Sequence, residues 1–137
     1  MLPKHNAGML AADTNVIVRY LTNDHPQQSP RARKLVDGHD VWVPTTVLLE
    51  TEWVLRSVYR HAPAAIAVAL RKFAGMPRVA LENPALAVQA LDWAERGMDF
   101  ADALHLGASD RCEAFATFDA EFTKSAKKAS AGRVIAP

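Results

Sequence analysis

Carboxylate side chains stand at or beside the ends of short apolar runs at several places in this chain. Asp13 closes the run Met9–Ala12, and Asp119 follows the run Phe115–Phe118. An acidic residue just after a short buried strand lies at the carboxyl end of that strand, where open α/β sheets bind ligands. If the fold gathers these acids, their combined negative charge requires a cation, which favours metal-dependent chemistry on phosphate groups. The acidic positions are Asp13, Glu50, the pair Asp99 and Asp102, and Asp119.

Each of these acids also has a purely structural interpretation. Asp13, Asp99 and Asp119 each precede a predicted helix, where an aspartate can cap the first turn. Asp102 could complement the dipole of the helix that Asp99 opens. For Asp99 the capping role is sufficient by itself. Asp102 precedes the small apolar stretch Ala103–Ala108, and a carboxylate at the rim of a buried helix favours a role in a site.

Glu50 and Glu52 share one predicted helix and lie on opposite shoulders of its apolar stripe, so periodicity does not choose between them. Glu52 has Arg56 four residues later, the spacing of a stabilising surface ion pair. Glu50 has apolar neighbours at the same spacing and no local cation. Glu50 therefore either extends to water or takes part in chemistry with a partner from elsewhere.

The residue types favour magnesium or manganese over zinc. Two carboxylates about 4 Å apart repel by about 4 kcal/mol at an effective dielectric constant of about 20, and a divalent ion removes that cost. Oxygen ligands alone suit Mg²⁺ or Mn²⁺. The five histidines are scattered without metal-ligand spacing, and Cys112 is the only cysteine. The phosphate-binding glycine loops of nucleotide-binding proteins are also absent from the sequence.

The bulk properties indicate one ordinary globular domain. The chain has 137 residues and a net charge of +1, which neither requires nor excludes a nucleic-acid partner. A single cysteine cannot form an intramolecular disulfide, which fits a reducing compartment such as the cytoplasm. No apolar stretch approaches the roughly 18 residues of a membrane span. We expect residues 1–8 to be an extension and residues 9–137 to form the domain.

Strand and helix signals alternate along the chain. We expect strands at residues 10–13, 41–43, 78–81, 115–118 and 134–135, with helices between them. Ser29-Pro30 and Asn83-Pro84 predict helix starts, and Thr45 or Thr46 is expected to cap another helix. The pattern predicts an α/β fold in which helices cover both faces of a short, mostly parallel sheet.

Four segments of this sequence resemble the motifs of PIN-domain ribonucleases of the VapC toxin type. They are Met9–Leu21, Val47–Leu55, Asp99–His105 and Ala116–Phe122, and the resemblance extends from Met9 to about Ile135. It implies a PIN-like sandwich and an endoribonuclease that depends on Mg²⁺ or Mn²⁺. It also implies a homodimer that cuts RNA and is neutralised by a VapB-type antitoxin.

The resemblance also implies roles for individual residues. Asp13, Glu50 and Asp119 match acids of the family, and the remaining acid fits Asp99 or Asp102, of which we favour Asp102. The expected catalytic residues are Asp13, Glu50, Asp102 and Asp119, and the same residues together with Asp99 are the expected metal ligands. Supporting roles are expected for three small polar residues, Thr14, Asn15 and Thr117.

An ion at these acids would lower the pKa of a bound water and so provide a nucleophile for the RNA phosphodiester. Because RNA must approach an acidic site, cations should flank it. The densest basic stretch follows Asp119 and contains Lys124, Lys127, Lys128 and Arg133, of which the three lysines are candidate RNA contacts. A second basic stretch contains Arg31, Arg33 and Lys34. For any single one of these residues, a solvated helix face is the more ordinary interpretation. The competing function is a PIN-like module that binds RNA or protein without catalysis.

Overall fold

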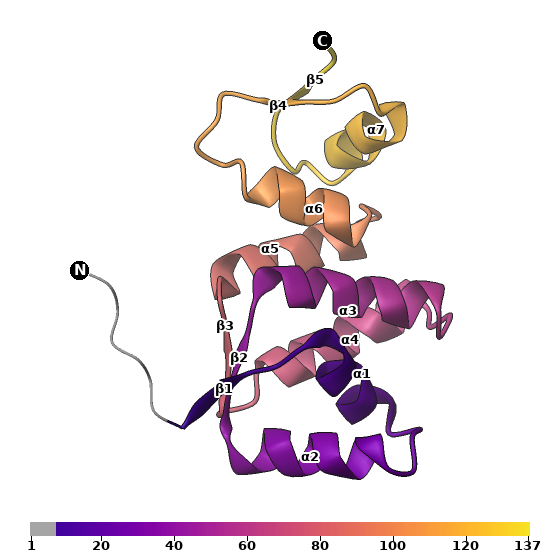
Figure 1. Cartoon of the computed structure of the whole chain (residues 1–137). Coiled ribbons are helices and arrows are strands. Elements are labelled where there is room, and N and C mark those ends of the chain that lie inside the picture. Colours follow the sequence, from indigo (N-terminus) through magenta and orange to yellow (C-terminus); the bar gives the residue numbers. More distant parts are fainter. Residues whose placement is uncertain (1–7) are drawn as a thin grey trace, which may run out of the picture.

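The computed structural model describes residues 8–137, so the expected extension over residues 1–8 lies, except for Gly8, outside the described part. Strands and helices alternate as predicted (Figure 1). The strands are β1 (Met9–Ala11), β2 (Asp40–Val43), β3 (Val79–Leu81), β4 (Phe115–Ala116) and β5 (Val134–Ile135). The helices are α1 (Thr14–Thr22), α2 (Gln28–Gly38), α3 (Thr45–Ser57), α4 (Pro63–Ala74), α5 (Pro84–Glu95), α6 (Phe100–Gly107) and α7 (Ala120–Lys128).

All strand pairs of the described chain are parallel, which confirms the α/β class. The first sheet has the order β1-β2-β3, with Leu10 opposite Val41 and Val41 opposite Val79. Parallel neighbours need long crossover connections, and helices provide them here. The strands β4 and β5 form a second sheet of their own. Figure 1 shows this second sheet with α7 at the end of the molecule away from β1, with α5 and α6 between them.

One apolar core joins these parts. Val41 and Val43 are fully buried in the first sheet, and Phe122 and Ala126 of α7 belong to the same buried cluster. The α5 and α6 helices pack tightly against each other at Gly107. A Cβ atom added there would stand 2.6 Å from the Leu86 side chain, so a larger residue would require that side chain to move.

Two predicted helix starts are wrong. The α2 helix begins at Gln28, because the His25 ring nitrogen Nδ1 accepts hydrogen bonds from the backbone of Gln27 and Gln28, and Ser29 lies buried inside the helix. The α3 helix begins after Pro44, so neither Thr45 nor Thr46 caps it. The caps predicted at Asn83, Asp99, Asp13 and Asp119 are present.

No helix within residues 8–137 is long and apolar enough to cross a membrane.

Candidate functional site

Three of the predicted site acids cap helices. The Oδ1 atom of Asp13 accepts from the Thr14 backbone at 2.8 Å. The Oδ1 atom of Asp99 accepts from the Asp102 backbone at 3.0 Å, and that of Asp119 accepts from the Glu121 backbone at 2.9 Å. An ionised carboxylate has about four lone-pair sites, so a cap that uses Oδ1 leaves Oδ2 for another partner. The structural interpretation is therefore correct for all three, and for Asp13 and Asp119 it leaves Oδ2 available to a ligand.

Glu50 belongs to α3, and its side chain contacts the start of α1. The buried hydroxyl of Thr14 donates a hydrogen bond to the exposed carboxylate of Glu50, which ties α3 to the helix that Asp13 caps. The residues are 36 positions apart in sequence, so this pairing belongs to the tertiary fold. Thr14 thus holds Glu50 with its side chain and Asp13 with its backbone, and its supporting role in a site remains a prediction.

Glu52 has a different environment. The predicted ion pair with Arg56 is present, with Arg56 Nε 2.9 Å from Glu52 Oε2, but Glu52 is only 6% exposed. The expected surface pair is therefore buried on its acidic side. The Arg56 guanidinium also lies 3.5 Å from Asp99 Oδ2. The hydrogen bonds that Arg56 donates to Glu52 are the main reason that the pKa of Arg56 is raised, and the charge of Asp99 adds to it.

This bridge to Asp99 was missed by sequence reasoning. The spacing of Glu52 and Arg56 revealed their pairing, but nothing local indicates that the same guanidinium reaches a third carboxylate. Because both oxygens of Asp99 already have positive or donor partners, Asp99 is the less available of the two candidate third acids.

Asp102 is half-buried, and its side chain accepts no hydrogen bond from the described residues. Burial raises the pKa of Asp102, and the charges of Asp99 and Asp119 raise it further, while His105 opposes them. Asp102 is thus near enough to Asp99 and to Asp119 for their charges to repel its own. A bound cation would reduce this repulsion and would also stabilise the charge of the half-buried carboxylate.

The donor set suits Mg²⁺ or Mn²⁺ by type, because every candidate ligand is a carboxylate or a hydroxyl. Among residues 8–137, however, no three acidic, histidine or cysteine side chains gather closely enough to hold an ion as they stand. The acids fall into two groups, which we call the α1 group (Asp13, Thr14, Glu50) and the α6–α7 group (Asp99, Asp102, Asp119). Their joint action on one ion remains a prediction.

The remaining predicted residues lie around these groups. Thr117 Oγ1 accepts a hydrogen bond of 3.0 Å from the Asp119 backbone, so it shapes the turn that presents Asp119. Lys124, Lys127 and Lys128 are exposed on α7. Lys127 and Lys128 occupy its last turn, about 12 Å along the helix from Asp119, where they stabilise the helix dipole. Their contact with RNA remains a prediction.

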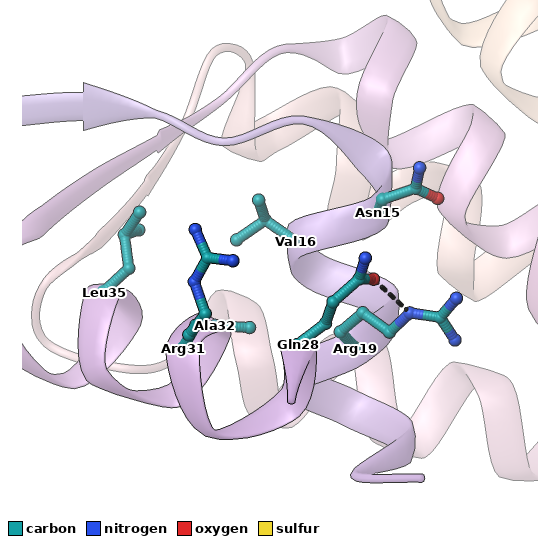
Figure 2. A pocket seen from close by; sticks show the side chains of 7 residues that line it. All are labelled: Asn15, Val16, Arg19, Gln28, Arg31, Ala32 and Leu35. Atoms are coloured by element: carbon teal, nitrogen blue, oxygen red, sulfur yellow. Dashed lines mark hydrogen bonds between the residues drawn. The ribbon is translucent and has the colours of Figure 1, made fainter. Parts of the chain in front are cut away.

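A pocket of about 350 Å³ opens between α1 and α2 (Figure 2). We call it the α1–α2 pocket. Asn15, a predicted supporting residue, lies on its wall, and Arg19 is fixed there by a 2.9 Å bond to Gln28. Sequence reasoning missed this pocket, although Asn15 and Arg19 have the four-residue spacing that shares a helix face. Its lining residues are Asn15, Val16, Arg19, Gln28, Arg31, Ala32 and Leu35.

The sequence and the fold were compared with those of known proteins to find the family of this chain. No curated protein matches this sequence significantly. Among solved structures, the VapC20 toxin of Mycobacterium tuberculosis, which cleaves the sarcin–ricin loop, aligns over 85% of this chain and 94% of its own, with 21% identity and a TM-score of 0.43. That likeness is too remote to argue from. Residues 11–128 match the PIN domain family, a span that contains every acid of both groups. The chain therefore belongs to the PIN domain family.

Proposed function

We propose that this PIN-domain protein is a metal-dependent endoribonuclease and the toxin of a VapBC toxin–antitoxin module. The observation that carries the proposal is the family match over residues 11–128, within which the fold places the motif acids at the N-termini of α1, α6 and α7. Helix N-termini attract anions such as phosphate, and the remaining carboxylate oxygens are ligands for a hard cation.

In this proposal Asp13 and Asp102 hold Mg²⁺ or Mn²⁺, and Glu50 and Asp119 complete the catalytic set. A bound ion of this kind supplies an activated water and offsets charge on the phosphoryl oxygens. The other residues of the chain orient these carboxylates. Thr14 holds Glu50 through its hydroxyl and Asp13 through its backbone, and Thr117 holds the turn before Asp119. Asp99 caps α6 and is held by Arg56, so it plays a positioning role.

Cleavage of RNA tests the proposal directly. We expect the wild-type protein to cut single-stranded RNA with Mn²⁺ and to stop when the metal is chelated. Asp13→Asn should lower the rate by at least about 100-fold, the scale of losing one main electrostatic group. Asp110→Asn is the matched control, since Asp110 is an exposed carboxylate outside both groups. Equal cleavage by Asp13→Asn and wild type would refute the proposal.

The proposed partners are RNA, a VapB-type antitoxin and a second copy of the chain, in the cytoplasm. The exposed Cys112, which is outside any disulfide, is compatible with a reducing compartment. Large apolar side chains exposed on α3, α4 and α5, namely Trp53, Val68 and Val88, offer surface for protein contacts. Light scattering should give the mass of a dimer, and a monomer at micromolar concentration would remove the homodimer from the proposal.

One observation favours the alternative of a non-catalytic binding module. Asp13, Asp99 and Asp119 serve as helix caps, and no three acids of residues 8–137 are gathered for an ion. Thermal unfolding distinguishes the two functions, because a ligand that binds the folded state raises the melting temperature by mass action. The enzyme should gain stability with Mn²⁺ and lose that gain in Asp13→Asn. A melting temperature that ignores Mn²⁺ would favour the binding module.

A further inference from the structure

We propose that the α1–α2 pocket binds one unpaired nucleotide of single-stranded RNA beside the cleaved phosphodiester. The inference rests on the proposed ribonuclease function and adds where the substrate chain is held. It concerns a surface separate from the acids and from the lysines of α7.

The pocket wall is cationic on one side and apolar on the other. Its residues include two arginines and two amides but no carboxylate, and Val16, Ala32 and Leu35 supply apolar surface. A ligand for this wall needs an anionic part and a flat, weakly polar part. A nucleotide has both, because its phosphate pairs with guanidinium groups and its base stacks on apolar or guanidinium surfaces. The volume of the pocket, about 350 Å³, suits one compact group rather than a docked helix.

The two arginines of the pocket differ in whether their guanidinium groups already have partners. Arg19 is held by Gln28 and by the Tyr59 hydroxyl, each at 2.9 Å, and lies 3.7 Å from Asp24. It therefore forms a fixed and partly neutralised wall. Arg31 is exposed and has no hydrogen bond or ion pair with the described residues. Figure 2 shows its side chain rising from α2 into the space beside Val16 and Leu35. Arg31 is thus the charge available to a phosphate.

The pocket adjoins the proposed site through α1. Asn15, on the pocket wall, is the second residue after Asp13, which places it about 3 Å further along the helix axis. In the proposed arrangement, an RNA strand whose phosphate lies at Asp13 places its neighbouring nucleotide at this pocket. A base can turn into such a pocket only when it is unpaired, so the pocket selects single-stranded RNA.

Binding without cleavage tests this inference. The probe is a short fluorescent oligouridylate, titrated into the Asp13→Asn protein with and without Arg31→Ala. We expect Arg31→Ala to weaken binding by roughly tenfold, the scale of one hydrogen bond to a charged group. It should also lower the slope of log K against log salt by about 0.7, the value for one phosphate of a single strand. Arg33→Ala is the matched control, because Arg33 is an exposed arginine on α2 outside the pocket.

A larger loss of affinity and of salt slope in Arg31→Ala than in Arg33→Ala supports the pocket. Equal affinities and salt slopes for the two variants would overturn it. An oligomer with one abasic position should bind more weakly to the protein that keeps Arg31, and unchanged binding would show that the base is not held. A polyglutamate peptide that requires Arg31 while RNA does not would assign the pocket to an acidic peptide instead. Binding that depends on Arg31 in a protein that never cuts RNA would leave this inference intact and refute only the ribonuclease function.

Discussion

The α1 group and the α6–α7 group hold their acids by different forces. In the α1 group, Thr14 supplies neutral donors to Asp13 and Glu50. In the α6–α7 group, Asp99 is bound to the Arg56 guanidinium, while Asp102 is half-buried among like charges that raise its pKa. The carboxylates of the α1 group are therefore stabilised by hydrogen bonds, whereas Asp102 of the α6–α7 group is still repelled by its acidic neighbours. A cation would change the energy of the second group more than that of the first.

The largest expected effect tests whether the two groups act as one site. Asp13→Asn and Asp102→Asn should each reduce RNA cleavage by at least about 100-fold. The double variant should be no slower than the slower single variant, because residues that act as a unit are not additive. Rates of a single RNA turnover provide the measurement. If the two losses multiply in the double variant, the groups work independently.

The next effect concerns Arg56, the cation of the α6–α7 group. Arg56→Met should lower the free energy of unfolding by about 1–2 kcal/mol, because it leaves the buried Glu52 carboxylate without its partner. Adding Glu52→Gln should restore part of this loss, since an amide is cheaper to bury than a charge. Urea unfolding measures both. An Arg56→Met protein as stable as wild type would mean that water satisfies Glu52.

A smaller effect separates capping from charge in the α1 group. Asp13→Ala should lower the free energy of unfolding by about 1 kcal/mol through the lost cap, whereas Asp13→Asn should cost little because asparagine caps equally well. Both variants should lose RNA cleavage. Calorimetry of the two proteins makes the comparison. Equal destabilisation by both substitutions would show that the charge, rather than the cap, stabilises α1.

The smallest effect has the opposite sign. Asp102→Asn should raise the melting temperature of the metal-free protein slightly, because it removes a carboxylate whose charge is disfavoured by burial and by Asp99 and Asp119. The same substitution should remove the stabilisation by Mn²⁺. Thermal unfolding with and without the ion shows both. A lower melting temperature in the metal-free variant would mean that Asp102 has a stabilising partner in solution.

Much of the local structure could be predicted from the sequence, and the errors have physical causes. The caps at Asp13, Asp99 and Asp119 were predicted correctly. The start of α2 was not, because a histidine ring replaces the usual capping oxygen. The strands were predicted and their parallel pairing was confirmed, but the separate β4–β5 sheet was not expected. Strand patterns record burial, and they carry no information about which edges meet.

The sequence by itself determined the α/β class, the family motifs and the helix caps, because these depend on residues that are close along the chain. Only the tertiary structure decided which acids share a neighbourhood. The Thr14–Glu50 hydrogen bond, the Arg56–Asp99 ion pair and the α1–α2 pocket each join separate helices. Such contacts form where packing brings two elements together, and neither element's own sequence specifies its partner.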